Sequence, residues 1–134
     1  MNIIMEPIGY IRSPFKEKKE IPKQSILAED KKGIIEILPE YEEGIEDIMV
    51  GSYGIILFYF HESKKTPLKV VSHKTNKMTG VFSTRSPNRP NGIGMSIVKF
   101  TRVEKNKLGF QGVDMLDNTP ILDIKPYSSK LNPE

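Results

Sequence analysis

The sequence predicts a mainly β protein, a small closed or partly closed barrel of about seven short strands with at most one or two short helices. Seven segments carry this prediction, because they alternate apolar with polar residues and are rich in β-branched and aromatic side chains. They are residues 7–12, 33–38, 53–60, 68–73, 95–103, 108–113 and 121–124. Closing such short strands into a barrel leaves no unpaired strand edge exposed.

The segments between the strands complete this prediction. Only residues 40–49 have helical spacing, and Gly44 interrupts it, so we expect one short helix or a pair of turns there. Four polar residues, 104–107, separate two predicted strands, which is typical of an antiparallel hairpin. No G-x-G-x-x-G, P-loop or G-x-S-x-G motif is present, so the fold is not expected to be of the Rossmann type.

Length and composition predict one globular domain over residues 1–134. The longest apolar run is residues 55–60, far below the roughly 20 residues that cross a bilayer as a helix. The first residues do not resemble a secretion signal, so we expect a cytoplasmic protein without a membrane partner. The chain has no cysteine and two histidines, and no metal site is therefore expected.

The net charge is only +3, but the charges are unevenly distributed along the chain. Residues 36–47 contain six acidic and no basic side chains. Residues 64–77 contain no acid and five lysines, Lys64, Lys65, Lys69, Lys74 and Lys77. These clusters predict either a basic face that attracts nucleic acid or ordinary solvated charges.

Residues 80–94, GVFSTRSPNRPNGIG, form the most unusual segment. Pro87 and Pro90 fix φ, so we expect a stiff loop that presents Arg85 and Arg89 at low entropic cost. The residues that follow, Asn91, Gly92 and Gly94, can adopt positive φ or let a ligand come close to the backbone. The segment is either a ligand-binding loop or a rigid barrel corner with its arginines in solvent.

A second polar group surrounds the last predicted strand. Residues 117–120 form a polar turn that ends at a proline, and Asp123 follows between two apolar residues. Asp123 either pairs with Arg85, Arg12 or Lys125, or orients an arginine at a site. His61 stands where a strand meets a loop, which is a frequent place for ligand contacts but also for a simple strand cap.

Five segments resemble the TrmO (TsaA-like, YaeB-like) family of tRNA methyltransferases in its short single-domain form. They are IGYIRSPF at 8–15, IPKQ at 21–24, FH at 60–61, GVFSTRSPNRPNGIGMSIV at 80–98 and DNTPILDIKPY at 117–127. The chain departs from the family at Gly92, where proline is usual, and at Asn118, where glycine is usual.

The resemblance implies a non-Rossmann barrel that binds S-adenosyl-L-methionine and forms a homodimer with the cofactor site near the subunit interface. It also implies methyl transfer to N6 of threonylcarbamoyladenosine, next to the anticodon of a threonine tRNA. The alternatives are a non-catalytic module that binds S-adenosylmethionine or RNA, and a structural interaction domain.

The resemblance also implies the site residues. Cofactor binding is carried over to Ser25, Ile26, Leu27, His61, Glu62, Arg85, Asp117, Asn118, Thr119 and Pro120. The candidates for binding the modified nucleotide are Arg89, Asn91 and Lys125, and those for positioning the reacting groups are Arg85, Arg89 and Asn91. No catalytic base is implied.

Overall fold

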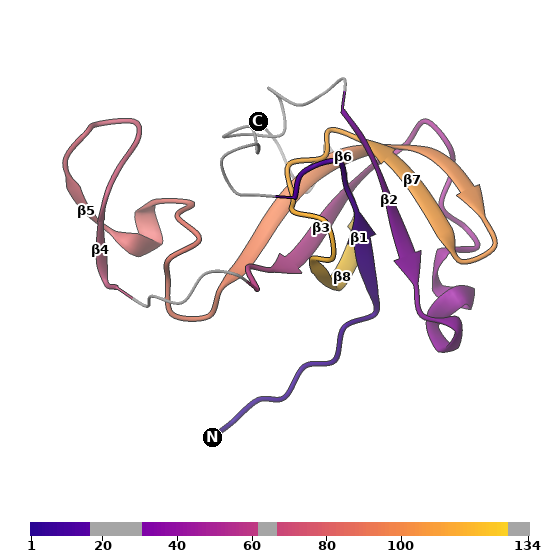
Figure 1. Ribbon diagram of the computed structural model, residues 1–134, viewed down its shortest axis with the longest axis horizontal. Helices are drawn as coiled ribbons and strands as arrows, with labels where there is room; N and C mark the ends of the chain where they lie inside the picture. The colour runs from indigo at the N-terminus through magenta and orange to yellow at the C-terminus, as the bar shows by residue number, and fades with distance from the viewer. Residues whose placement is uncertain (17–30, 62–66, 129–134) are drawn as a thin grey trace.

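A closed barrel of six strands forms the body of the protein (Figure 1). The computed structural model describes residues 1–16, 31–61 and 67–128. Around the barrel the strand order is β1-β2-β7-β6-β3-β8, and each neighbouring pair is antiparallel. The strands are β1 (Gly9–Arg12), β2 (Lys32–Ile37), β3 (Tyr53–Tyr59), β6 (Ile93–Glu104), β7 (Lys107–Gln111) and β8 (Pro120–Pro126). The predicted barrel is confirmed, and its antiparallel pairing differs from the parallel sheet of a Rossmann fold.

One of the seven predicted strands lies outside the barrel. Residues 68–73 contain β4 (Lys69–Val71), which pairs with β5 (Met78–Gly80), a strand that the sequence pattern did not predict. Neither strand has a buried residue, so the hairpin stands apart from the core (Figure 1). We call residues 68–92, which comprise this hairpin, the short helix η4 (Val81–Ser83) and the loop up to β6, the arm.

The helical segment is shorter than the pattern suggested. Residues 39–45 form the 3₁₀ helix η3 (Pro39–Ile45), and turns follow it. Ile45 is buried and fixes this helix to the core. The predicted β6–β7 hairpin is confirmed, with Lys105 in the left-handed region at φ 53°. No helix within the described residues is long and apolar enough to cross a membrane.

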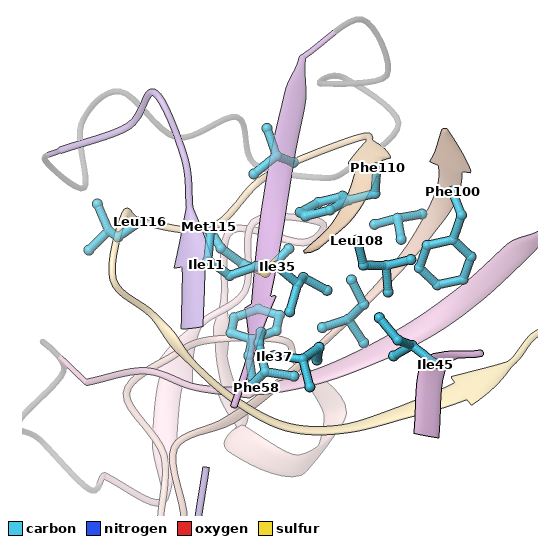
Figure 2. Packing of buried hydrophobic residues seen from close by; sticks show 14 of the residues in the cluster. Ile11, Ile35, Ile37, Ile45, Phe58, Phe100, Leu108, Phe110, Met115 and Leu116 are labelled. Carbon is cyan, nitrogen blue, oxygen red and sulfur yellow. The ribbon is translucent and has the colours of Figure 1, made fainter. Parts of the chain in front are cut away.

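Alternate residues of each barrel strand fill the interior (Figure 2). Ile11, Ile35, Leu108 and Phe110 have no exposed surface, as expected for the inward face of a strand with a two-residue period. Gly94 lies where two aromatic rings approach the backbone, because a Cβ atom there would stand 2.6 Å from the ring of Phe58. Its φ is not positive, so the close approach explains the glycine.

The two ends of the barrel carry different chemistry. At one end, which we call the motif end, β1, β3 and β7 finish and β2, β6 and β8 begin, as the pairs Lys32↔Gln111, Tyr59↔Ile93 and Tyr10↔Pro120 show. The arm leaves from this end (Figure 1). The opposite end carries η3 with most of the acidic cluster, Glu40, Glu42, Glu43, Glu46 and Asp47. The acidic cluster around η3 therefore lies at the end of the barrel opposite to the arm.

Candidate functional site

Segments that are far apart in the sequence meet at the motif end. The end of β1, the residue His61 after β3, the loop before β6 and the turn before β8 all lie there. Loops gathered at one end of a rigid scaffold are a common architecture for binding sites. Four predicted cofactor residues, Ser25, Ile26, Leu27 and Glu62, lie outside the described residues.

The loop before β6 is held by a chain of side-chain to backbone hydrogen bonds. The Thr84 hydroxyl donates to the carbonyl of Val81 at 2.8 Å and accepts from the N–H of Ser86 at 3.3 Å. The Ser86 hydroxyl accepts from the N–H of Asn88 at 3.2 Å. These bonds and the two prolines both restrict the backbone of the loop, in the direction that the sequence analysis expects.

The two arginines of this loop have different environments. Arg89 is half-buried, and its Nη1 donates to the carbonyls of Thr84 and Ser86 at 2.9 Å and 3.2 Å. Its Nε–Nη2 edge takes no part in these bonds. Arg85 and Asn91 are exposed. Arg89 therefore stabilises the loop, whereas Arg85 is presented by it.

Asp114, just after β7, is a candidate functional residue that the sequence analysis missed. Ser96, which is 2% exposed, donates its hydroxyl to Oδ1 of Asp114 at 2.7 Å. Burial raises the pKa of Asp114, although the Ser96 hydrogen bond and the charge of Arg85 act to lower it. Asp114 is thus a largely desolvated carboxyl group, and the positive charge of Arg85 stabilises its ionised form. The signal in the sequence was an acid within an apolar run, V-D-M-L.

The turn before β8 is tied to the end of β1. Asp117 accepts a hydrogen bond from the N–H of Ser13 at 2.9 Å and forms an ion pair with Lys16 at 2.9 Å. Desolvation acts to raise the pKa of Asp117, but the bonds from Lys16 and Ser13 and the charges of Lys16 and Arg12 outweigh it, so the pKa is lowered. The Asp117 side chain thus links two strands at the motif end.

The next residues of this turn also have structural partners. Arg12 donates from Nη1 to Oδ1 of Asn118 at 3.0 Å, and it also pairs with Glu36. Asn118 has φ 71°, a left-handed conformation that glycine and asparagine tolerate best. Thr119 is 3% exposed and donates its hydroxyl to the carbonyl of Leu116 at 2.7 Å. Asn118 thus adopts a left-handed conformation that glycine would also adopt readily.

A shallow cleft of about 410 Å³ opens between the end of β1 and the start of β2. Its lining includes three cationic side chains and one carboxylate, those of Arg12, Lys16, Lys32 and Asp117. Lys16 pairs with Asp117 and Arg12 pairs with Glu36, so the positive charge of Lys32 is the excess that suits an anionic ligand group. Among the described residues, no three His, Cys, Asp or Glu side chains are grouped as metal ligands would be.

Two predicted residues lie away from the motif end. Asp123 forms an ion pair with Lys125 at 3.0 Å, which selects one of the three partners that the sequence left open. Register places Asp123 beside Leu57 and Lys125 beside Ile55, on the outer wall of the barrel. The structure does not bring Lys125 to the other predicted site residues.

The closed antiparallel barrel, with a stiff arginine loop and a cationic cleft at one end, defines a ligand-binding domain outside the Rossmann class. Over residues 10–132 the chain matches the tRNA-methyltransferase O N-terminal domain, and it belongs to this family.

Comparison with individual proteins agrees with this assignment. A probable S-adenosyl-L-methionine-binding protein of Pyrococcus abyssi is 46% identical over 93% of this chain and 68% of its own length. The mouse tRNA (adenine(37)-N6)-methyltransferase is 40% identical over 94% of this chain and 31% of its own length. The crystal structure of TrmO from Pseudomonas aeruginosa superimposes with a TM-score of 0.85 at 40% identity, over 100% of this chain and 60% of that chain. The chain thus spans only part of these longer relatives.

Proposed function

We propose that this protein is an S-adenosylmethionine-dependent tRNA methyltransferase that methylates N6 of threonylcarbamoyladenosine next to the anticodon, in the cytoplasm. The observation that carries the proposal is that four of the five motif segments, all except residues 21–24, reach the same end of the barrel. The names of the related proteins, which include an adenine(37)-N6 methyltransferase, support the same reaction.

The chemistry needs positioning more than it needs a reactive side chain. S-adenosylmethionine supplies a methyl group on a positively charged sulfur, and its transfer to nitrogen is an in-line displacement. Holding two reactants in such an arrangement can supply about 7–11 kcal/mol of the barrier. A stiff loop on a closed barrel is suited to this task.

The predicted roles of individual residues follow from this proposal. Arg85 and Asp117 hold the cofactor at the motif end, where Arg12, Lys16 and Lys32 favour its carboxylate. Ser25, which lies outside the described residues, is proposed to bind the cofactor as well. Arg89 and Asn91 face the modified nucleotide. Its threonyl carboxylate suits the Nε–Nη2 edge of Arg89. Lys125 would need to act from the outer wall of the barrel.

Two measurements on the purified protein test the proposal. In calorimetry, S-adenosylmethionine should bind, and at about 100 times its Kd it should stabilise the fold by about 2.7 kcal/mol. Mass spectrometry of nucleosides should then show a new methyl group on threonylcarbamoylated threonine tRNA and none on the unmodified transcript. Binding without methyl transfer would favour the non-catalytic module, and equal methylation of both transcripts would contradict the substrate assignment.

We also propose a homodimer, on the basis of the family resemblance and of an apolar outer wall. Across β3 and β6 the pairs Tyr59↔Ile93, Leu57↔Met95 and Ile55↔Ile97 lie on the outer wall, although Ile55 itself is only 8% exposed. Exposed fractions are 52% for Tyr53, 44% for Tyr59, 37% for Ile93, 40% for Met95 and 39% for Ile97. A contiguous apolar wall of this kind marks an interaction surface.

Light scattering at micromolar concentration should therefore give the mass of two chains. Met95→Glu should shift the mass toward one chain, because it would place a carboxylate in the apolar wall that the second subunit is proposed to cover. A wild-type mass of one chain would contradict the proposal.

A further inference from the structure

The arm combines strong positive charge with a complete lack of acid. No Asp or Glu occurs from residue 64 to residue 103. Within the arm, residues 68–92, the basic side chains are Lys69, Lys74, Lys77, Arg85 and Arg89. The arm projects from the motif end, so its charge lies beside the proposed active site (Figure 1). A polyanion would be attracted to this surface.

Phe82 is the exposed aromatic residue of the arm. It lies in η4 and is 75% exposed. Its neighbour Val81 is 1% exposed, and the N–H of Val81 donates to the carbonyl of Leu68 at 2.9 Å. The N–H of Thr84 donates to the carbonyl of Val81 at 3.0 Å, which closes the turn. The backbone on both sides of Phe82 is therefore fixed while the ring faces solvent.

A phenyl ring held in water next to arginines is a typical feature of single-stranded nucleic-acid sites. Bases stack on such rings, and neighbouring cations bind the phosphates. Arg85 is exposed three residues after Phe82. Lys69 lies in β4, and Lys74 and Lys77 lie in the turn between β4 and β5, just before η4 in the chain. Ring and charge thus stand together on one projecting element.

We propose that Phe82 stacks on an unpaired base of the tRNA anticodon loop while the lysines of the arm contact its phosphates. This inference rests on the proposed function, because it assumes that tRNA is the substrate. It assigns the substrate-recognition surface to the arm. The outer wall of β3 and β6 is left for the second subunit.

Binding of an anticodon stem-loop RNA to the full chain tests this proposal. Phe82→Ala should raise the Kd about 5-fold to 150-fold, the range that corresponds to replacing an aromatic side chain under a stacked base by alanine. Phe82→Trp should restore affinity, and Phe82→Leu should not, because leucine is apolar but offers no ring face. The matched control is Met78→Ala on β5, which removes a similarly exposed apolar side chain (64%) from the same hairpin and should leave the Kd unchanged.

Several outcomes would overturn the inference. An unchanged Kd for Phe82→Ala, or wild-type affinity for Phe82→Leu, would show that the ring does not stack. A Phe82→Ala variant that becomes monomeric in light scattering would place the residue in the subunit interface instead. If wild type binds the RNA through Phe82 but methylates no tRNA, the proposed function fails and the arm assignment stands. If wild type methylates tRNA and Phe82→Ala binds normally, the arm assignment alone fails.

Discussion

Arg85→Ala is expected to weaken S-adenosylmethionine binding about tenfold to hundredfold, because a hydrogen bond to a charged group contributes about 1.5–3 kcal/mol. The free energy of unfolding should change by less than about 1 kcal/mol, since an exposed arginine contributes little to the fold. Calorimetry measures the first quantity, and urea denaturation without ligand measures the second.

A control distinguishes this effect from a general loss of positive charge. Arg102 is also exposed, lies near the opposite end of β6 and pairs with Glu104 at 3.1 Å. Arg102→Ala should leave the affinity for S-adenosylmethionine unchanged. If Arg85→Ala instead unfolds the protein while the folded fraction binds normally, Arg85 is a structural residue.

Asp114→Asn is expected to raise stability and lower function at neutral pH. The raised pKa of Asp114 means that the folded state binds its proton more tightly than the unfolded state does. This group therefore favours the fold fully at a pH below its ordinary pKa of 3.8, and the contribution is lost as the pH rises through the folded-state value. Asparagine has no charge to desolvate and can still accept the Ser96 hydrogen bond.

The melting temperature of Asp114→Asn should therefore exceed that of wild type at pH 7, and the difference should shrink toward pH 4. The affinity for S-adenosylmethionine should fall by about tenfold, because Arg85 loses its countercharge and neighbouring charges are coupled by about 0.5–3 kcal/mol. In Arg85→Ala protein the same substitution should cause no further loss of affinity. Equal losses in both backgrounds would show that Asp114 does not act through Arg85, and a variant less stable than wild type at pH 7 would contradict the stability argument.

The barrel could be predicted from the sequence because a barrel wall has one buried face and one solvent-exposed face. Each strand then shows a two-residue period, as β6 does from Gly94 to Val98. For residues 68–73 the pattern correctly predicted a strand, β4, but not its position outside the barrel, since alternation does not tell which strand is the partner. β5 was missed because Met-Thr-Gly is too short to show a period, and only its pairing with β4 makes it a strand.

The sequence drew attention to candidate site residues in the loop rich in proline and glycine, and it did not do so for Asp114, whose neighbours in the sequence are ordinary apolar residues. Two prolines and several glycines marked the loop before β6, and side-chain hydrogen bonds of Thr84 hold its backbone in the structure. The partner of Arg89 could not be predicted, because the loop's own carbonyls became its acceptors only after folding. Asp114 was missed because its burial depends on Ser96, a residue of another strand.

The barrel closes where β1 pairs with β8, and this pairing involves fewer residues than any other in the barrel. β1 and β8 pair at only two positions, Gly9↔Ile121 and Tyr10↔Pro120, whereas β3 and β6 pair at seven. Pro120 has no N–H to donate, so hydrogen bonds from Ile8 and Ile11 hold most of this seam. Local opening of the barrel should therefore occur first between β1 and β8. The bond between Asp117 and Ser13 lies beside this seam, so a ligand that orders the motif end would also slow hydrogen exchange along β1, including at amides that it does not touch.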